Sequence, residues 1–433
     1  GATAAGKAKE PISLRSWGGR FEALDRLLHV YERHPIRPLR ETAMRLGAEW
    51  ILRRQEADGG WGGIQPPWVY SLMALHLLGY PLDHPVMQAG LRGLDGFTVF
   101  DRDFRRLEAC QSPVWDTGLA VVALRDAGLP QDHPAVVSAV RWLLDEEIRV
   151  PGDWSVRRPE LAPGGWGFEY ANDNYPDLDD TAEVVMALRA TTGVGEVEAA
   201  VEAAVGRAVD WTFGMQCRDG GWGAFDVDNT RALCRELPFC DFGEVIDPPT
   251  ADVTAHVVEM LCEEGLADDP RTRAGVEWLL RAQESDGSWF GRWGANHVYG
   301  TGAVVPALIR AGVDAGDPAI RRAMAWLESI QNPDGGFGED LRSYREPGWR
   351  GVGDSTPSQT AWALLALLDG GGAEAVIRRA VDWLVAHQRE DGDWDEALFT
   401  GTGFPGDFYI RYHQYRLNFP IMALGRYLRR APA

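Results

Sequence analysis

Three carboxylates fall within four residues, at Asp177, Asp179 and Asp180, and an apolar run follows at residues 184–188. Either Asp179 or Asp180 could N-cap a helix that begins at Thr181, because a short carboxylate accepts the free N–H groups of a first helical turn. Three buried negative charges so close together cannot all ionise cheaply, so at least one aspartate should keep its proton near neutral pH. The pattern predicts a Brønsted acid, although a well-capped helix start on a solvated loop would also explain it.

A histidine on another apolar segment is the natural partner for such an acid. His256 follows Asp252 by four residues and Thr254 by two. A lone histidine on a helix is more often a structural residue than a catalyst. Its place after a repeated threonine nevertheless puts it at the same end of the fold as Asp179. A hydrogen bond from His256 would then determine which carboxyl oxygen carries the proton.

Aromatic residues are frequent in the loops beside the same segments, where Gly and Pro interrupt the helical pattern. Most aromatic side chains are simply core. An acid that faces an aromatic-lined cavity would suit carbocation chemistry, because π faces stabilise a cation without acting as nucleophiles. The candidates are Trp115, Phe168, Phe225, Trp293, Tyr299, Phe404, Phe408, Tyr412 and Tyr415.

A repeat supplies the helices that must position these residues. Its pattern is Trp, four residues, Gln, three residues, Gly, one residue, Trp, and each first Trp lies on a helical pattern that ends in a Gly turn. We expect the repeated Gln and Trp to brace neighbouring helices, since tryptophan is a large and stiff packing element. The six segments begin at Trp50, Trp211, Trp278 and Trp383, with degenerate copies at Trp326 (where Phe337 replaces the last Trp) and at Trp142 (where Glu147 replaces Gln and Trp154 ends the segment).

A second set of helices alternates with the first, and their starts share a Thr followed by a small residue. These helices are apolar nearly all round, which indicates burial on both sides. Concentric helical layers of this kind predict an all-α fold of α/α barrels, with every inner helix beginning at the same end. A first amphipathic helix is expected at residues 21–31, after a loose start. The shared threonines are Thr117, Thr181, Thr254, Thr301 and Thr360.

Composition narrows the function further. The net charge of the 433 residues is -21, which argues against nucleic-acid binding because little would neutralise phosphates. The five cysteines show no paired or metal-ligand spacing, and this fits reduced thiols in a cytosolic setting. We expect no signal peptide and no membrane-spanning helix, and attachment to a membrane surface remains open. Asp226 and Asn229 could bind a hard cation, but a loop brace is the favoured interpretation.

Several of these segments resemble one family. The stretch Asp177-Leu178-Asp179-Asp180-Thr181-Ala182 resembles the Asp-x-Asp-Asp-Thr-Ala signature of squalene–hopene cyclases, and the Gln…Gly-x-Trp turns look like the QW repeats of triterpene cyclases. The resemblance extends from about Phe21 to Arg426. Further segments that read as those of the family begin at Gly63, Ser112, Pro238, Gly291 and Gly401.

The resemblance implies an enzyme that cyclises squalene to hopene or hopanol in a cavity between two α/α barrels. It makes Asp179 the proton donor to a terminal alkene, supported by Asp177 and Asp180, with His256 hydrogen-bonded to the acid and Asp252 and Tyr299 in the same polar network. It implies no cofactor and no metal. The resemblance places Ile64, Gln65 and Pro66 where the last cation is quenched, and Phe239 and Cys240 in the access channel. It also implies that eight aromatic residues stabilise the cations or shape the cavity: Trp115, Phe168, Phe225, Trp293, Phe404, Phe408, Tyr412 and Tyr415.

Three departures from the family pattern matter. Phe225 stands where a tyrosine is usual, and Cys110 stands near a position often held by serine. Members of the family also have a further N-terminal portion, so residues 1–110 would form only the latter part of a second barrel, and residues 111–433 a complete barrel with the acid motif. A half-built barrel would expose apolar helix faces. The chain would then be a fragment, one piece of a two-chain enzyme, or a diverged product.

The expected partners follow from the same resemblance. They are squalene or a related isoprenoid, a membrane surface contacted peripherally from the cytoplasmic side, and the missing N-terminal portion, a second chain or a second copy. Other readings stay open: a class II cyclase of sesqui- or diterpenoids, a glycosidase on an (α/α)₆ barrel with two opposed carboxyls, a zinc-dependent prenyltransferase subunit, or a non-catalytic scaffold derived from a cyclase.

Overall fold

The computed structural model describes residues 15–237 and 245–430 of the chain. Helices form most of it, and the described strands are confined to two short antiparallel hairpins, β1 (Thr98–Asp101) with β2 (Phe104–Leu107), and β3 (Gly401–Phe404) with β4 (Phe408–Ile410). The fold is therefore all-α, as the repeat pattern predicts. No helix within the described ranges is long and apolar enough to cross a membrane.

Six inner helices form a closed ring within the described residues. Each contacts the next, from α5 to α7, α9, α11, α13 and α15, and α15 returns to contact α5. Almost every residue of α7 and α13 is buried, which explains their all-round apolar pattern. The inner helices are α5 (Pro113–Asp126), α7 (Leu178–Leu188), α9 (Ala251–Glu263), α11 (His297–Arg310), α13 (Pro357–Gly370) and α15 (Tyr415–Arg430).

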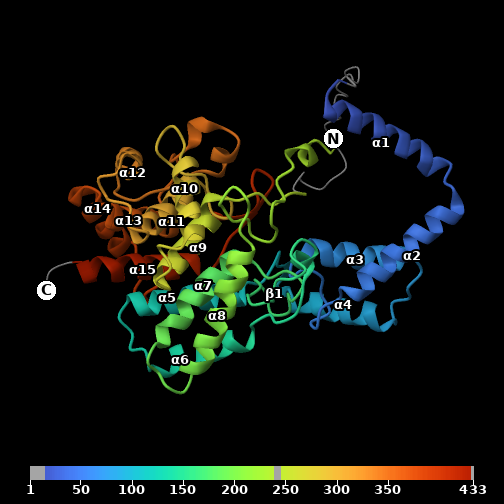
Figure 1. Ribbon diagram of the computed structural model, residues 1–433, viewed down its shortest axis with the longest axis horizontal. Coiled ribbons are helices and arrows are strands. Elements are labelled where there is room, and N and C mark those ends of the chain that lie inside the picture. Colours follow the sequence, from blue (N-terminus) through green and yellow to red (C-terminus); the bar gives the residue numbers. More distant parts are fainter. Residues whose placement is uncertain (1–14, 238–244, 431–433) are drawn as a thin grey trace.

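Outer helices alternate with the inner ones along the chain and pack against the ring, which gives the α/α barrel visible in Figure 1. Because an outer helix returns the chain between each inner helix and the next, the inner helices all begin at the same end. The outer helices are α6 (Pro134–Asp145), α8 (Glu198–Gly214), α10 (Pro270–Arg281), α12 (Pro318–Ile330) and α14 (Glu374–Ala386). Short 3₁₀ helices lie in the connecting loops at Asp153–Val156, Arg189–Thr191, Ala232–Glu236, Leu341–Tyr344 and Pro347–Trp349.

The repeated Gln and Trp brace the barrel, as predicted. The Gln216 side chain donates to the carbonyl of Gly220 at 2.8 Å and to the carbonyl of Arg271, in the first turn of α10, at 2.8 Å. The buried indole of Trp222 donates to the carbonyl of Thr212 at 2.8 Å. Gly220 has a φ of 99°, and a Cβ there would lie 2.7 Å from the carbonyl oxygen of Ala274, so only glycine fits this turn.

The degenerate repeat that begins at Trp142 departs from the prediction. Trp166 rather than Trp154 takes the place of the second repeat tryptophan, since its indole donates to the carbonyl of Leu143 at 2.6 Å. Glu147 pairs with Arg207 on α8 at 2.6 Å instead of bonding a turn. The chain between the Trp142 helix and the bracing indole of Trp166 is longer than in the other repeats, so the fixed repeat spacing does not identify Trp166.

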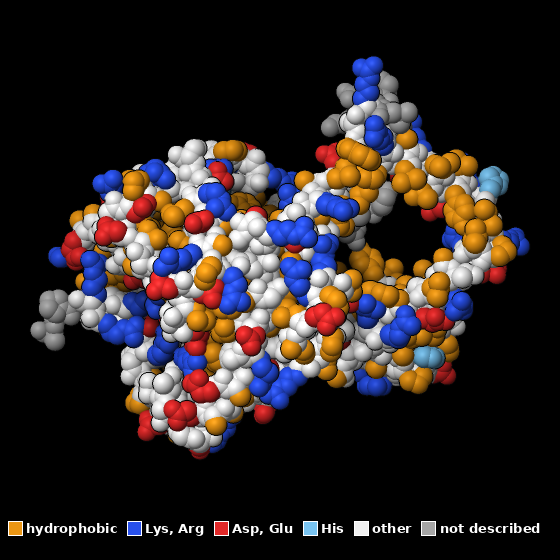
Figure 2. All heavy atoms as spheres, viewed as in Figure 1, with side chains coloured by type: hydrophobic (Ala, Val, Ile, Leu, Met, Phe, Trp, Pro, Cys, Tyr) orange, Lys and Arg blue, Asp and Glu red, His pale blue; other side chains and the backbone are white. Residues whose placement is uncertain are grey.

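The N-terminal helices form a separate arm, drawn in blue in Figure 1, with a small core of its own around Trp61, Trp68 and Leu75. The arm comprises α1 (Trp17–Arg33), which is longer than predicted because Ser16 caps it, α2 (Arg37–Arg53), α3 (Gln65–Leu77) and α4 (Pro85–Gly96). Figure 2 shows hydrophobic side chains gathered along this arm around a hollow. The large apolar side chains exposed on α1–α3 are Trp17, Leu24, Leu27, Leu28, Val30, Leu39, Met44, Leu46, Trp50, Tyr70, Met73 and Leu77, which agrees with the expected apolar exposure.

Candidate active site

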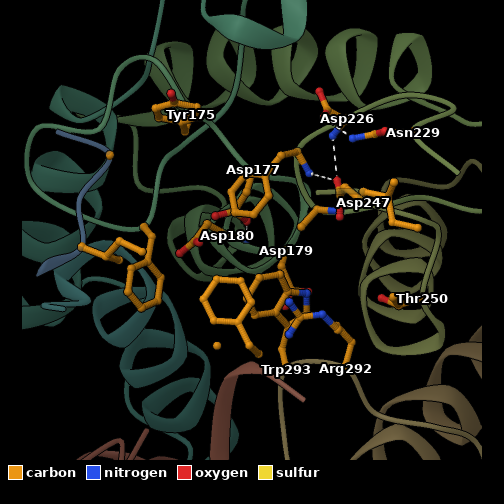
Figure 3. A pocket seen from close by; sticks show the side chains of 18 of the residues that line it. Tyr175, Asp177, Asp179, Asp180, Asp226, Asn229, Asp247, Thr250, Arg292 and Trp293 are labelled. Atoms are coloured by element: carbon orange, nitrogen blue, oxygen red, sulfur yellow. Dashed lines mark hydrogen bonds between the residues drawn. The ribbon is translucent and has the colours of Figure 1, made fainter. Parts of the chain in front are cut away.

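A cavity of about 990 Å³ lies at the end of the barrel where the inner helices begin. Its wall combines loops of the barrel with Trp61 and Ile64 from the N-terminal arm. Figure 3 shows Asp177, Asp179 and Asp180 together at this end, near the side chains of Arg292 and Trp293. The three carboxylates of the acid motif all line the cavity.

The acid motif forms the first turn of α7. Asp177 is the N-cap, and its Oδ1 accepts the backbone N–H of Asp180 at 2.7 Å. The helix therefore begins at Leu178, and the prediction that Asp179 or Asp180 caps a helix from Thr181 is wrong. Thr181 instead donates from its hydroxyl to the Asp177 carbonyl at 2.6 Å. Because Asp177 supplies the cap, the side chain of Asp179 is not used at the helix start; it lines the cavity and contacts α9.

His256 on α9 forms the closest contact with the acid. Its Nδ1 lies 2.6 Å from Oδ1 of Asp179, and both side chains are about nine-tenths buried. Burial is the largest single influence and lowers the pKa of His256, but the charge and hydrogen bond of Asp179, together with the charges of Glu183 and Asp252, outweigh it and raise the pKa to about 10. While Asp179 is a carboxylate, the imidazole is therefore cationic near neutral pH, and its Nδ1–H donates to Asp179.

Neighbouring carboxyls keep their protons to a higher pH than usual. Burial, and secondarily the charge of Asp177, raises the pKa of Asp180 well above its usual range, and burial raises the pKa of Asp177 to about 7. One carboxyl oxygen of Asp180 is buried without a hydrogen-bond partner among the described residues. The site thus stores protons beside an apolar cavity, which is the electrostatic arrangement that a general acid requires.

Asp252 and Tyr299 lie behind the acid rather than in the cavity wall. The fully buried Asp252 accepts the backbone N–H groups of Arg292 at 2.7 Å and of Trp293 at 2.8 Å, so it holds the loop that presents Trp293 to the cavity. The Tyr299 ring packs 6.1 Å from the His256 ring, and its buried hydroxyl has no hydrogen-bond partner among the described residues. Neither residue is hydrogen-bonded to the Asp179–His256 pair.

All the other aromatic candidates named for the cavity line it. Tyr412 and Tyr415 stack with centroids 4.3 Å apart, and the Phe168 ring meets Tyr412 edge-on at 6.2 Å. Trp115 donates from its indole to the Tyr415 hydroxyl at 3.0 Å, and its ring centroid lies 6.3 Å from that of His256. The complete set is Trp115, Phe168, Phe225, Trp293, Phe404, Phe408, Tyr412 and Tyr415.

Only part of the segment predicted for the final quench lines the cavity. Ile64 lines the cavity as the N-cap residue of α3, whereas Gln65 and Pro66 form the first turn of that helix and do not line it. The backbone N–H of Gln65 donates to the carbonyl of Ala109 at 2.8 Å. Cys110 also lines the cavity. The predicted channel residues Phe239 and Cys240 lie outside the described residues.

Sequence reasoning gave no role to Asp247, which lines the cavity, or to Asp116, which directly follows the cavity residue Trp115. Asp247 accepts the backbone N–H groups of Phe225 at 2.6 Å and Asp226 at 2.8 Å, and so fixes the loop that carries Phe225. Asp116 bonds Ser112 at 2.7 Å, and burial raises its pKa to about 6. Asp116 was already visible in the segment beginning at Ser112, whereas Asp247 had no sequence signal. Asn229 donates to Asp226 at 2.9 Å, which confirms the predicted loop brace.

Comparisons with known proteins agree on one family. The model described as Squalene-hopene cyclase C-terminal domain matches residues 111–429, and the corresponding N-terminal domain model matches residues 2–103. The chain is 54% identical to the squalene–hopene cyclase of Alicyclobacillus acidocaldarius over 94% of its own length and 64% of that relative. It is 41% identical to the enzyme of Zymomonas mobilis over 95% of its own length and 64% of that relative.

A solved structure shares the fold at lower identity. The ent-copalyl diphosphate synthase from Streptomyces platensis superposes with a TM-score of 0.51 at 22% identity, over 80% of this chain and 55% of that one. This likeness concerns the fold alone. The chain spans 64% of the length of the curated relatives described above.

Proposed function

Because the chain belongs to the squalene–hopene cyclase family, we propose that it carries the acid and most of the cavity wall of an enzyme that cyclises squalene to hopene or hopanol. The observation that supports this most directly is the Asp179–His256 pair, 2.6 Å apart, at the edge of an aromatic-lined cavity of about 990 Å³. A carboxylic acid held beside π faces can start a cation and leave it without a nucleophile.

The first step is protonation of a terminal alkene by Asp179. His256 donates to Oδ1, so the transferable proton resides on the other carboxyl oxygen. As the C–H bond forms, the O–H electron pair remains on Asp179, and the new carboxylate is stabilised by the hydrogen bond from Nδ1–H of His256. Asp177 orders the helix turn that carries the acid, and the neutral Asp180 adds no competing charge.

The aromatic wall then stabilises the successive cations. The Trp115 ring contacts His256, and its indole bonds Tyr415, which stacks on Tyr412, so we assign these three residues to the first ring. Phe168, Phe225, Trp293, Phe404 and Phe408 face the remaining cavity and are assigned to later cations. Ile64, with Gln65 and Pro66 beside it, is assigned to the last cation, which ends by loss of a proton or capture of water.

The substrate and setting follow from the same proposal. An isoprenoid that is insoluble in water must reach the cavity from a membrane, and we propose peripheral attachment at the cytoplasmic face. The exposed apolar side chains of α1–α3 support contact of the arm with the remaining third of the relatives' length, supplied in the same or a second chain. A homodimer would be the alternative cover for this surface.

Product analysis tests the proposal. Squalene is incubated with the chain alone and with the chain combined with the part of the Alicyclobacillus relative that it does not span, and products are identified by mass spectrometry. We expect cyclised triterpene from native protein, none from Asp179→Asn, and native levels from Asp226→Asn, which alters a carboxylate elsewhere in the same cavity wall. Absence of any cyclised product in both preparations would refute the function.

A further inference from the structure

A second, smaller cavity lies behind the acid, inside the ring of inner helices. It has a volume of about 50 Å³, and His256 and Tyr299 line it together with Glu183 and Glu259. A buried water needs roughly 10–15 Å³ and two or more polar partners, so this space can hold more than one water. Asp179 lines the substrate cavity on one side of His256, and the second cavity lies on the other.

Glu183 is the carboxyl of the second cavity that lies on the same helix as the acid. It lies on α7 four residues after Asp179, and side chains at that spacing are neighbours on a helix surface. It is only 7% exposed and forms no ion pair with any residue in the described ranges. Burial raises its pKa to about 7, against the opposing charge of His256, so the carboxyl holds a proton for much of the time at neutral pH. The proposed initiation step does not use this residue.

A line of charged side chains leads from Glu183 toward solvent at the opposite end of the barrel. Glu259, on α9 next to His256, pairs with Arg310 at 3.0 Å, and Arg310 pairs with Glu263 at 2.6 Å. The side chain of Arg310 is 32% exposed, and that of Arg125, which also lines the second cavity, is 28% exposed. Solvent is therefore reached without crossing the aromatic cavity.

The proposed reaction creates a need for such a route. Each turnover removes a proton from Asp179, and the proton released at the end of the cascade leaves at the quench site rather than at the acid. Water that entered through the aromatic cavity would quench early cations. We propose that Glu183 returns the proton to Asp179 after each turnover, through water, and is itself reprotonated from the opposite end of the barrel by way of the second cavity. This inference rests on the proposed function.

The step balances without any further reactant. The O–H bond of Glu183 breaks, a bridging water accepts that proton while it gives one of its own, and an O–H bond forms on Asp179. Glu183 is left as a carboxylate and takes a proton from solvent water through the second cavity. His256 keeps its Nδ1–H throughout and continues to hold Oδ1 of Asp179.

Comparison of the first turnover with later ones tests this assignment, in the preparation that cyclises squalene. With enzyme in excess, Glu183→Gln should form product within about twofold of the native rate, because Asp179 is protonated before substrate arrives. With squalene in excess, kcat should fall at least about tenfold after a burst of one product per site. Ala303→Val, which fills the second cavity and leaves Glu183 in place, should lower kcat in the same way.

The matched control is Glu396→Gln. Glu396 is as buried as Glu183, at 7% exposure, but lines neither cavity and bonds Ser358 and Thr400. An unchanged kcat in Glu183→Gln, an equal fall in its first-turnover rate, or the same burst in Glu396→Gln would overturn the relay. A native protein that makes no product in its first turnover would instead refute the proposed function.

Discussion

Replacement of Asp179 by Asn should remove most of the force that keeps His256 cationic. The two side chains are 2.6 Å apart and both are buried. Two unit charges at that distance attract by about 6 kcal/mol at an effective dielectric constant of about 20, which corresponds to roughly four to five pKa units. The asparagine has almost the same shape, so the change removes charge and leaves the packing in place.

The expected result is a pKa of His256 that falls from about 10 to below its ordinary 6.5. Burial lowers this pKa, and after the substitution only the weaker influences of Glu183 and Asp252 oppose it. The imidazole should therefore be neutral at physiological pH in Asp179→Asn and cationic in the native protein. Cyclisation should be lost in the same variant while the fold is retained.

Nitrogen NMR of the histidine rings measures the effect directly, from about pH 5 to about pH 10. The chain has nine histidines, and the spectrum of His256→Gln identifies the signal of interest. Asp226→Asn serves as the control, since Asp226 lines the cavity but bonds Asn229 rather than His256. A pKa that stayed above about 9 in Asp179→Asn would show that Asp179 does not charge the imidazole, and the acid assignment would lose its electrostatic basis.

Other predictions follow from the same geometry. His256→Ala should slow initiation without changing which rings form, and a normal rate with an altered product spectrum would place His256 at a late cation instead. Binding to lipid vesicles should survive about 1 M salt, because a chain with net charge -21 must attach through apolar contacts, whereas release by salt alone would contradict this. The chain by itself should release at most monocyclic or bicyclic alcohols, because the exposed apolar faces of α1–α3 imply an open cavity wall that admits water. Adding the rest of the relatives' length should restore pentacyclic product. Pentacyclic product from the chain alone would refute this prediction. Trp222→Ala should lower the free energy of unfolding, measured with denaturant, by about 3–5 kcal/mol. Trp17→Ala should lower it much less, because Trp222 is fully buried and Trp17 is exposed. Similar losses in the two variants would show that Trp222 does not brace the barrel.

The repeated threonines show how far periodicity carries the prediction of this fold. Their spacing indicated helix starts. In the structure the hydroxyl oxygens of four of the five accept the backbone N–H of a repeat aromatic at 2.9–3.1 Å: Thr181 from Trp166, Thr254 from Trp222, Thr301 from Trp289 and Thr360 from Phe337. The contact explains why Thr and Trp recur together. The partners lie up to 32 residues apart along the chain, so only the folded barrel identifies them.

By itself the sequence determined the barrel, the end at which the inner helices begin, and the acid motif, because each is written as a local pattern of apolar period, turn residues and clustered charge. It placed His256 beside Asp179 through the register of the repeat. Tertiary structure alone decided that Asp177 rather than Asp179 caps α7, that Asp252 holds the Trp293 loop, and that Glu183 faces a second cavity. Those roles depend on which side chains are left without water when distant helices meet, and burial of that kind has no local signature in the chain.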